Sequence, residues 1–206
     1  MQYALDNIEF GQMNAVVKKL GGKEGVERFL RGELVVTDPA NLTAKPRLRS
    51  STSKKVLADL LELEGDPIRL PAVDRFVARD KFVVDRNGEL PISYLGHNFK
   101  ANFLGKTEEK VKKATLKRRK LLKSSLDAPI LDALGGEKKA EVALAHAFEF
   151  LKTADRDRWY IFYVRDANGN LWAVRAYWDD RGWDVSAYSV SCPDGWDDGY
   201  RVVSPR

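Results

Sequence analysis

The densest group of charged side chains in the sequence is a basic run between residues 106 and 123, which holds nine lysines and arginines and two acidic residues. The sequence predicts a helix over residues 107–124. Thr107 can cap its start, and Glu108 and Glu109 fall in the first turn, where the helix dipole favours negative charge. The basic residues on this helix are Lys110, Lys113, Lys117 and Lys120 along one face, with Lys112, Arg119 and Lys123 beside them.

Like charges at helical spacing repel one another, so a stable basic helix calls for a counter-charge. The phosphates of nucleic acid could supply it, as could the acidic C-terminal part of the same chain, or solvent alone. The leading hypothesis is a small protein that binds the backbone of RNA or DNA non-specifically through this basic helix. A protein–protein interaction module without a nucleic-acid role is an alternative.

A second group of residues could carry out acid–base chemistry. His146 lies one helical turn from Glu149, and the two could act as acid and base on RNA while Arg165, Arg175 or Tyr177 holds the phosphate. The enzyme alternative is therefore a metal-free, ribonuclease-like phosphodiesterase around His146. The simpler interpretation is that His146 is an ordinary surface histidine, so a binding protein is favoured over an enzyme.

Two short motifs resemble ligand sites but lack required residues. Gly105-Lys106-Thr107 is similar to the end of a phosphate-binding loop, but Lys100 stands where that loop needs its first glycine. Residues 166–170 resemble the start of a calcium loop, but Leu171 replaces the glycine at the sixth position. Two histidines and one cysteine, none at ligand spacing, also predict no metal site. We therefore expect no metal and no cofactor.

Composition and charge indicate a globular protein with an uneven charge distribution. The 206 residues are 44% hydrophobic and 32% charged, with a net charge of +5. Residues 51–125 hold 17 basic and 10 acidic side chains, whereas residues 126–206 hold 10 and 14. This asymmetry is compatible with binding to a polyanion or with one part of the chain docking on the other.

The sequence predicts a cytoplasmic protein. Its single cysteine, Cys192, cannot form an internal disulfide. No apolar run approaches the roughly 18 to 20 residues that a membrane-spanning helix needs. The first residues lack the basic and apolar regions of a signal peptide.

Aromatic residues are concentrated in residues 159–190, which hold four of the five tryptophans and four of the seven tyrosines. Asn168-Gly169 between two aromatic runs is a strong hairpin signal, and a third run follows, so this stretch predicts a three-stranded antiparallel meander. The first run is apolar on both alternating faces, which is typical of a central strand covered on both sides. We interpret the aromatics as core, with a platform for stacking nucleic-acid bases as the alternative.

The remaining elements frame this sheet. Two helices joined by Gly21-Gly22 form a helical hairpin that resembles part of a helix-turn-helix, although no third helix follows directly. Further elements are predicted as helices over 54–64, 127–134 and 137–152, strands over 76–84, 91–95 and 200–203, and one or two helical turns from His97. The predicted fold is α+β: a helical hairpin over 1–36, a basic linker or loop over 37–53, and an α+β domain over 54–206 whose aromatic-rich antiparallel sheet is packed by two or three helices.

Three stretches of the sequence resemble a group of conserved, uncharacterised bacterial proteins found largely in small-genome candidate lineages. They are residues 19–34 (KLGGKEGVERFLRGEL), residues 98–106 (NFKANFLGK), and residues 161–166 (IFYVRD) together with 185–190 (VSAYSV). The resemblance covers most of the chain. It implies a bacterial cytosolic origin and nothing about chemistry.

Overall fold

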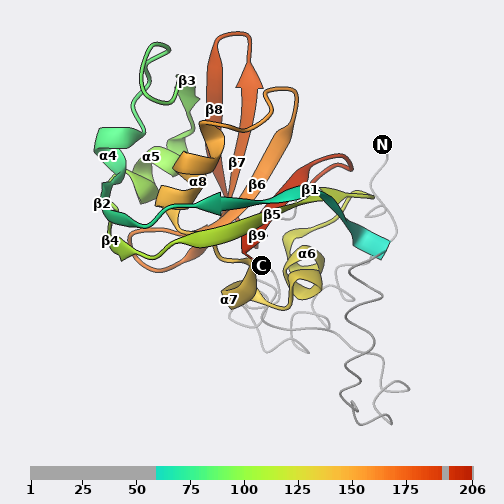
Figure 1. Cartoon of the computed structure of the whole chain (residues 1–206). Helices are drawn as coiled ribbons and strands as arrows, with labels where there is room; N and C mark the ends of the chain where they lie inside the picture. Colours follow the sequence, from blue (N-terminus) through green and yellow to red (C-terminus); the bar gives the residue numbers. More distant parts are fainter. Residues whose placement is uncertain (1–58, 192–194, 206) are drawn as a thin grey trace, which may run out of the picture. The chain divides into compact units, whose positions relative to one another are not determined.

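The computed structural model describes residues 59–191 and 195–205, all within the compact unit Arg49–Arg206. The helical hairpin expected over 1–36 and the linker expected over 37–53 lie outside the described residues. The described part is α+β, built on a seven-stranded mixed sheet in the order β1-β5-β9-β6-β7-β8-β3 (Figure 1). Neighbouring strands are antiparallel except for two parallel pairs, β9 with β6 and β8 with β3.

The strands of the large sheet are β1 (Leu61–Leu70), β3 (Ile92–Leu95), β5 (Ala114–Leu121), β6 (Trp159–Arg165), β7 (Leu171–Asp179), β8 (Gly182–Ser189) and β9 (Arg201–Pro205). A second, two-stranded sheet pairs β2 (Val73–Val77) with β4 (Thr107–Val111). The helices are α4 (Ala78–Lys81), α5 (His97–Phe103), α6 (Asp127–Leu134), α7 (Glu137–Ala140) and α8 (Leu144–Leu151).

The predicted meander is confirmed as β6, β7 and β8, joined in antiparallel order. The turn between β6 and β7 is closed by the Asp166 carboxylate, whose Oδ1 accepts hydrogen bonds from the backbone N–H groups of Asn168 and Asn170. Burial acts to raise the pKa of Asp166, but hydrogen bonds from Asn170 and Trp172 outweigh it and lower the pKa overall. An aspartate that bonds its own following backbone is a common device in tight turns.

Helices cover both faces of the central strands, as the doubly apolar first run predicts. On one face, Phe148 of α8 belongs to the same buried cluster as Phe162 of β6. On the other face, Ile130 of α6 and Ala140 of α7 pack in a second cluster with Ile161 of β6. Alternate residues of β6 therefore enter different cores, which is what a strand period of two requires.

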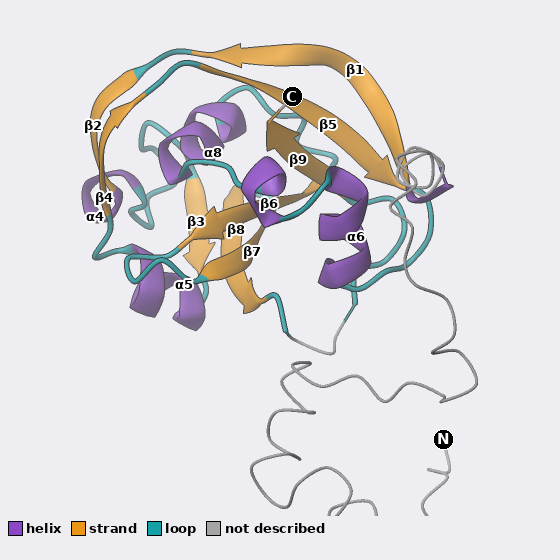
Figure 2. Cartoon of the chain, turned by 90° about the horizontal axis from the view of Figure 1, so that it is seen from below, coloured by secondary structure: helices purple, strands orange, loops and turns teal. Residues whose placement is uncertain are grey.

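The other half of the sheet is a long two-stranded ribbon. β1 leads into β2 and β4 leads into β5, so the two strand pairs together form one antiparallel ribbon that curves over α8 (Figure 2). Leu70 and Leu116 of the ribbon pack inward, in the cluster that contains Phe148. The register of β1 against β5 shifts between Glu64 and Ile68, which places a bulge in the edge strand.

The helix predicted over 107–124 is wrong, because these residues form β4 and β5. Lysine and arginine are good helix formers, but tertiary pairing overrides that weak preference, and β5 lies hydrogen-bonded between β1 and β9. Glu108 does cap a helix, but not its own. Its carboxylate accepts hydrogen bonds from the backbone N–H groups of Leu144 and Ala145 at the start of α8.

Three other predicted elements are corrected. The helix predicted up to residue 64 has given way to β1 by Leu61. The strand predicted over 76–84 is the end of β2 followed by α4, and β3 pairs with β8 rather than with that stretch. The single helix predicted over 137–152 is split into α7 and α8, because the intervening Val142 donates its backbone N–H to the carbonyl of Tyr163 on β6.

The remaining predicted elements are confirmed. They are the strand that becomes β3, the helical turns of α5, the helix α6, which ends at Gly135, and the last strand β9. None of the helices among the described residues is long and apolar enough to cross a membrane.

Candidate nucleic-acid interface

The basic residues of β5 alternate between two faces of the ribbon. Leu116 points to the α8 side, so Arg118 and Lys120 share that side, while Lys117 and Arg119 point the other way. Lys117 and Lys120, which a helix would place on one face, therefore lie on opposite faces. The single basic stripe expected from the sequence does not form.

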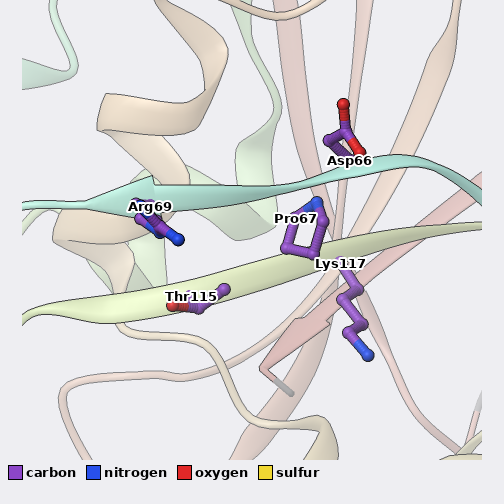
Figure 3. Close-up of a pocket in the computed structure, with 5 residues that line it drawn as sticks. All are labelled: Asp66, Pro67, Arg69, Thr115 and Lys117. Carbon is purple, nitrogen blue, oxygen red and sulfur yellow. The ribbon is translucent and has the colours of Figure 1, made fainter.

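The outer face of the ribbon, which we define by Arg69, Thr115 and Lys117, faces away from the α8 side. Arg69 of β1 is the cross-strand partner of Thr115 on β5, and Lys117 lies two residues further along β5 on the same side. Asp66 and Pro67 of the bulge complete the rim of a shallow hollow of about 430 Å³ here (Figure 3). The Lys117 side chain and the Asp66 carboxylate extend in opposite directions from the ribbon (Figure 3).

Arg69 and Lys117 form no ion pair with any other described residue, whereas three other basic residues of the run are already engaged. Lys106 Nζ lies 2.8 Å from Glu108 Oε1, Arg118 Nη1 lies 2.8 Å from Asp155 Oδ2, and Arg119 Nη1 donates to Ser204 Oγ at 2.6 Å. Burial also lowers the pKa of the Arg119 guanidinium. The outer face thus carries two cations that can still take an anion, and a hydroxyl between them.

The other predicted binding residues are scattered. Lys110 is exposed on β4 in a left-handed conformation, with φ of 51°. Lys112 and Lys113 are exposed where β4 passes into β5, and Lys123 is exposed beyond the end of β5. Lys120 stands directly opposite Glu62 of β1.

Part of the counter-charge that the basic run needs comes from the chain itself, through the ion pairs of Lys106 with Glu108 and of Arg118 with Asp155. Besides Glu62, Glu64 of β1 is the cross-strand partner of Arg118 and pairs with both Arg201 of β9 and Arg158. Of the explanations left open by the sequence, docking against the acidic C-terminal part is represented by the pair of Arg118 with Asp155, whereas Glu62 and Glu64 belong to β1.

The residues of the phosphodiesterase hypothesis do not converge. His146 is buried on α8, where its Nε2 donates to the carbonyl of Pro71 at 3.2 Å, so it is not the surface histidine that the sequence suggests. Glu149 pairs with Lys152 at 2.8 Å. Arg175 and Tyr177 alternate with Val174 and Ala176, which pack on the α8 side. They therefore project from the opposite face of the sheet.

Arg165, the last residue of that hypothesis, is also committed elsewhere. Its guanidinium pairs with Glu137 at 2.9 Å and Glu141 at 3.1 Å. The hydrogen bond that Arg165 donates to Glu137 is the main cause of a raised pKa for Arg165, and burial acts against it. These contacts fix α7 to β6, which is a structural role. Within the described ranges, no cluster of three or more histidine, cysteine, aspartate or glutamate side chains could hold a metal ion.

Arg69 and Thr115 were missed by sequence reasoning. The signal that could have found them is the position of Leu116 and Leu121, an odd number of residues apart in a polar run, which suits a strand with a different core on each side. Arg69 becomes relevant only once β1 is known to pair with β5. No protein-family model, no curated protein and no solved structure matches the chain.

Proposed function

We propose that this protein binds nucleic acid non-specifically, through backbone phosphates that contact the outer face of the ribbon. The observation that carries the proposal is the pair formed by Arg69 and Lys117 across the hollow, with Thr115 between them and no ion pair to any described residue. A guanidinium, an ammonium and a hydroxyl are the side chains that proteins commonly direct at phosphate oxygens.

The surface favours backbone contact over base reading. The exposed Lys110, Lys112 and Lys113 lie further along the ribbon, at the end of β4 and between β4 and β5, and add positive charge to it. Flexible lysines act as point charges and carry little information about sequence. We therefore expect affinity to depend on salt far more than on base sequence.

The test is binding of labelled RNA and DNA, followed by fluorescence anisotropy at several salt concentrations. Wild type should bind at about 50 mM salt, with log affinity falling linearly against log salt. The double charge reversal Arg69→Glu/Lys117→Glu should weaken all sequences about equally. It should also flatten the slope by about 1.4 on single strands or about 1.8 on duplex, since each lost phosphate contact removes about 0.7 or 0.9.

Two matched controls sharpen the test. Lys100→Glu/Lys138→Glu makes the same change in net charge at two exposed lysines on α5 and α7 and should affect binding less. Lys120→Glu reverses a charge on the other face of β5, so it should also have a smaller effect than Lys117→Glu. Absence of binding to any RNA or DNA at about 50 mM salt would refute the proposal, and equal effects of Lys117→Glu and Lys120→Glu would refute the assigned face.

A further inference from the structure

A second group of side chains gathers at one end of the meander, on the face opposite α8. The Trp159 ring of β6 stacks on the Tyr177 ring of β7, with centroids 4.0 Å apart and planes within 7° of parallel. Tyr200 lies beside Trp159 at 5.3 Å. Trp159 is 39% exposed, while Trp183 of the same sheet is 1% exposed. The stack is a rigid aromatic platform that reaches solvent.

Arg175 lies among these rings. Its guanidinium carbon is 5.3 Å from the Trp159 centroid and 5.1 Å from the centroids of Tyr177 and Tyr188. Its Nε is buried and has no hydrogen-bond partner among the described residues. Its nearest carboxylate, Asp184, is 4.0 Å from Nη2, which is beyond hydrogen-bonding distance.

The Asp184 carboxylate is already occupied by other donors. Ser186 donates its hydroxyl to Oδ1 at 2.9 Å, and Tyr177 donates to Oδ2 at 3.2 Å. Burial and the negative charge of Asp184 raise the pKa of Tyr177, so its hydroxyl stays protonated as the donor at neutral pH. The terminal nitrogens of Arg175, whose side chain is 21% exposed, therefore remain as donors for an incoming acceptor, whereas the buried Nε is out of its reach.

A small hollow adjoins this group on its β8 side. It has a volume of about 190 Å³ and is lined by Tyr94, His97, Asn98, Ser186 and Tyr188, together with Gly96 and Ala187. Ser186 and Tyr188 belong to both the hollow and the surroundings of Arg175. An occupant of the hollow would thus meet aromatic and hydrogen-bonding groups together.

We propose that this Trp159–Arg175 surface binds a base of single-stranded nucleic acid, with the base stacked on Trp159 and Arg175 donating to the adjoining phosphate. The inference rests on the proposed function for its ligand, but it names a different surface and a narrower substrate. Stacking on exposed tryptophan or tyrosine tolerates any base, and arginine adds a planar cation. In a duplex the ring faces are covered by neighbouring bases, so a single strand is the form that fits.

The charge around the surface sets the balance between base and phosphate. Asp197 lies near Tyr200, where its negative charge adds to the raising of the Tyr200 pKa by burial, and Arg175 opposes it. Asp197 would repel a phosphate at the same place. We therefore expect stacking to supply most of the affinity here, and expect Asp197→Asn to strengthen binding at low salt.

The experiment compares three probes on the full chain: a ten-residue oligothymidylate, an abasic strand of the same length, and a ten-base-pair duplex. Wild type should bind the oligothymidylate more tightly than the abasic strand. Trp159→Ala should lower affinity for the oligothymidylate by about 5- to 100-fold and leave the abasic strand unaffected. Trp159→Phe keeps a smaller ring and serves as the second variant in case Trp159→Ala misfolds. It should retain part of the preference for the oligothymidylate over the abasic strand. Trp178→Ala, which removes a half-buried tryptophan that packs on the α8 side of β7, is the control.

The outcomes separate this inference from the proposed function. Equal binding of the oligothymidylate and the abasic strand, unchanged by Trp159→Ala, would overturn base stacking and leave backbone binding in place. Base-dependent binding that ignores Arg69→Glu/Lys117→Glu would overturn the ribbon's role only. Failure of every probe to bind at about 50 mM salt would overturn both. A loss with Trp178→Ala equal to that with Trp159→Ala, at unchanged melting temperature, would assign the base to another surface.

Discussion

The ribbon and the meander belong to one sheet but use their faces differently. In the meander, β6 buries Ile161 in one core and Phe162 in the other, both fully. In the ribbon, Leu116 is buried on one face of β5 while Lys117, on the other, is partly exposed. β6 is covered on both faces over most of its length, whereas β5 is covered on the Lys117 face near its end, where Leu121 enters the second core. The rest of that face of β5 can present a row of side chains to a ligand.

The ribbon and the part of the chain that holds the meander also differ in charge. The basic run that forms β4 and β5 carries nine basic and two acidic residues, whereas residues 126–206 carry 10 and 14. The basic run meets the C-terminal part where Arg118 pairs with Asp155, and β1 meets it where Glu64 pairs with Arg201. The positive charge left over for a polyanion is therefore smaller than the sequence count suggests, and Lys117 and Arg69 hold the part of it that lies on the outer face.

The largest expected effect is in the core of the meander. Phe162 is fully buried, with its ring 5.4 Å from that of Phe150, so Phe162→Ala should lower the free energy of unfolding by about 3–5 kcal/mol. Lys117→Ala on the ribbon should change it by no more than about 0.5 kcal/mol. Chemical denaturation of both variants measures the difference. Similar midpoints for the two would show that the regions do not differ in this way.

Two glycines allow the edges of the two regions to be compared. A Cβ on Gly182 would lie 2.7 Å from the backbone nitrogen of Ser93 and 3.2 Å from the carbonyl oxygen of Pro91. Gly182→Ala must therefore push β3 away from β8, at a cost of about 1–3 kcal/mol. Gly65 in the ribbon's bulge has φ of +68°, and its Cβ would meet the flexible end of Arg118. Gly65→Ala should cost about 1 kcal/mol through its backbone conformation.

Thermal or chemical denaturation of the two alanine variants gives the comparison. Hydrogen exchange on the backbone N–H of Gly96, which donates to Val185 of β8, reports directly on the joint between β3 and β8. Faster exchange there in Gly182→Ala, but not in Gly65→Ala, is the expected pattern. An unchanged rate in Gly182→Ala would mean that the edge accommodates a methyl group without opening.

How far the sequence predicts this fold depends on how local its signals are. The meander was predictable because Asn168-Gly169 specifies a turn between two neighbouring runs, and α6 was predictable because its periodicity and Gly135 act within a few residues of each other. The ribbon was not, because its strands are joined by pairings such as Arg69 with Thr115, 46 positions along the chain. No local signal within residues 107–121 indicates that this stretch pairs with β1.

The candidate sites divide in the same way. Lys117 and Arg119 were identified from the sequence, but on a helix instead of a strand. The sequence therefore could not show that Lys117 remains without an ion pair to any described residue while Arg119 donates a hydrogen bond to Ser204. Arg175 and Tyr177 were also identified, but for a reaction with His146, from which the sheet separates them. The exposure of Trp159 could not be inferred, because an alternating aromatic strand looks the same whether a helix covers its end or not.

A smaller, pH-dependent effect is expected on the face that α6 covers. Asp127 of α6 is buried, its Oδ1 accepts from Tyr163 and from Trp196, and its Oδ2 has no partner among the described residues. Burial raises its pKa, and the two hydrogen bonds only partly oppose the shift. When the pKa of a group is higher in the folded than in the unfolded state, its contribution to stability is complete below the unfolded-state pKa. That contribution is lost as the pH rises through the folded-state pKa.

Asp127→Asn removes that loss, because asparagine cannot ionise and its carbonyl oxygen can still accept both hydrogen bonds. The variant should be close to wild type near pH 4, and its stability relative to wild type should increase as the pH rises toward 8. Melting temperatures of both proteins over that range measure the trend. A difference independent of pH would show that the folded protein accommodates the charged carboxylate.

The smallest expected effect concerns an exposed ion-pair network, and it sets a scale for the ribbon's surface charges. Glu89 lies 2.6 Å from Lys152 Nζ and 2.7 Å from Lys81 Nζ. Hydrogen bonds from Lys152 and then Lys81 lower the pKa of Glu89 to about 2, while burial acts weakly the other way. A depressed pKa contributes stability that is present above the unfolded value of 4.5 and is lost as pH falls from there toward 2.

Solvent screens a carboxylate that is 50% exposed, so Glu89→Gln should cost at most about 1 kcal/mol at pH 7 and almost nothing near pH 2. Lys152→Met should reproduce part of that cost and reduce the further effect of Glu89→Gln. A Glu89→Gln penalty well above 1 kcal/mol would mean that surface charges contribute more here than elsewhere, and the charge reversals on the ribbon would then need stability measurements before any loss of binding was assigned to phosphate contacts.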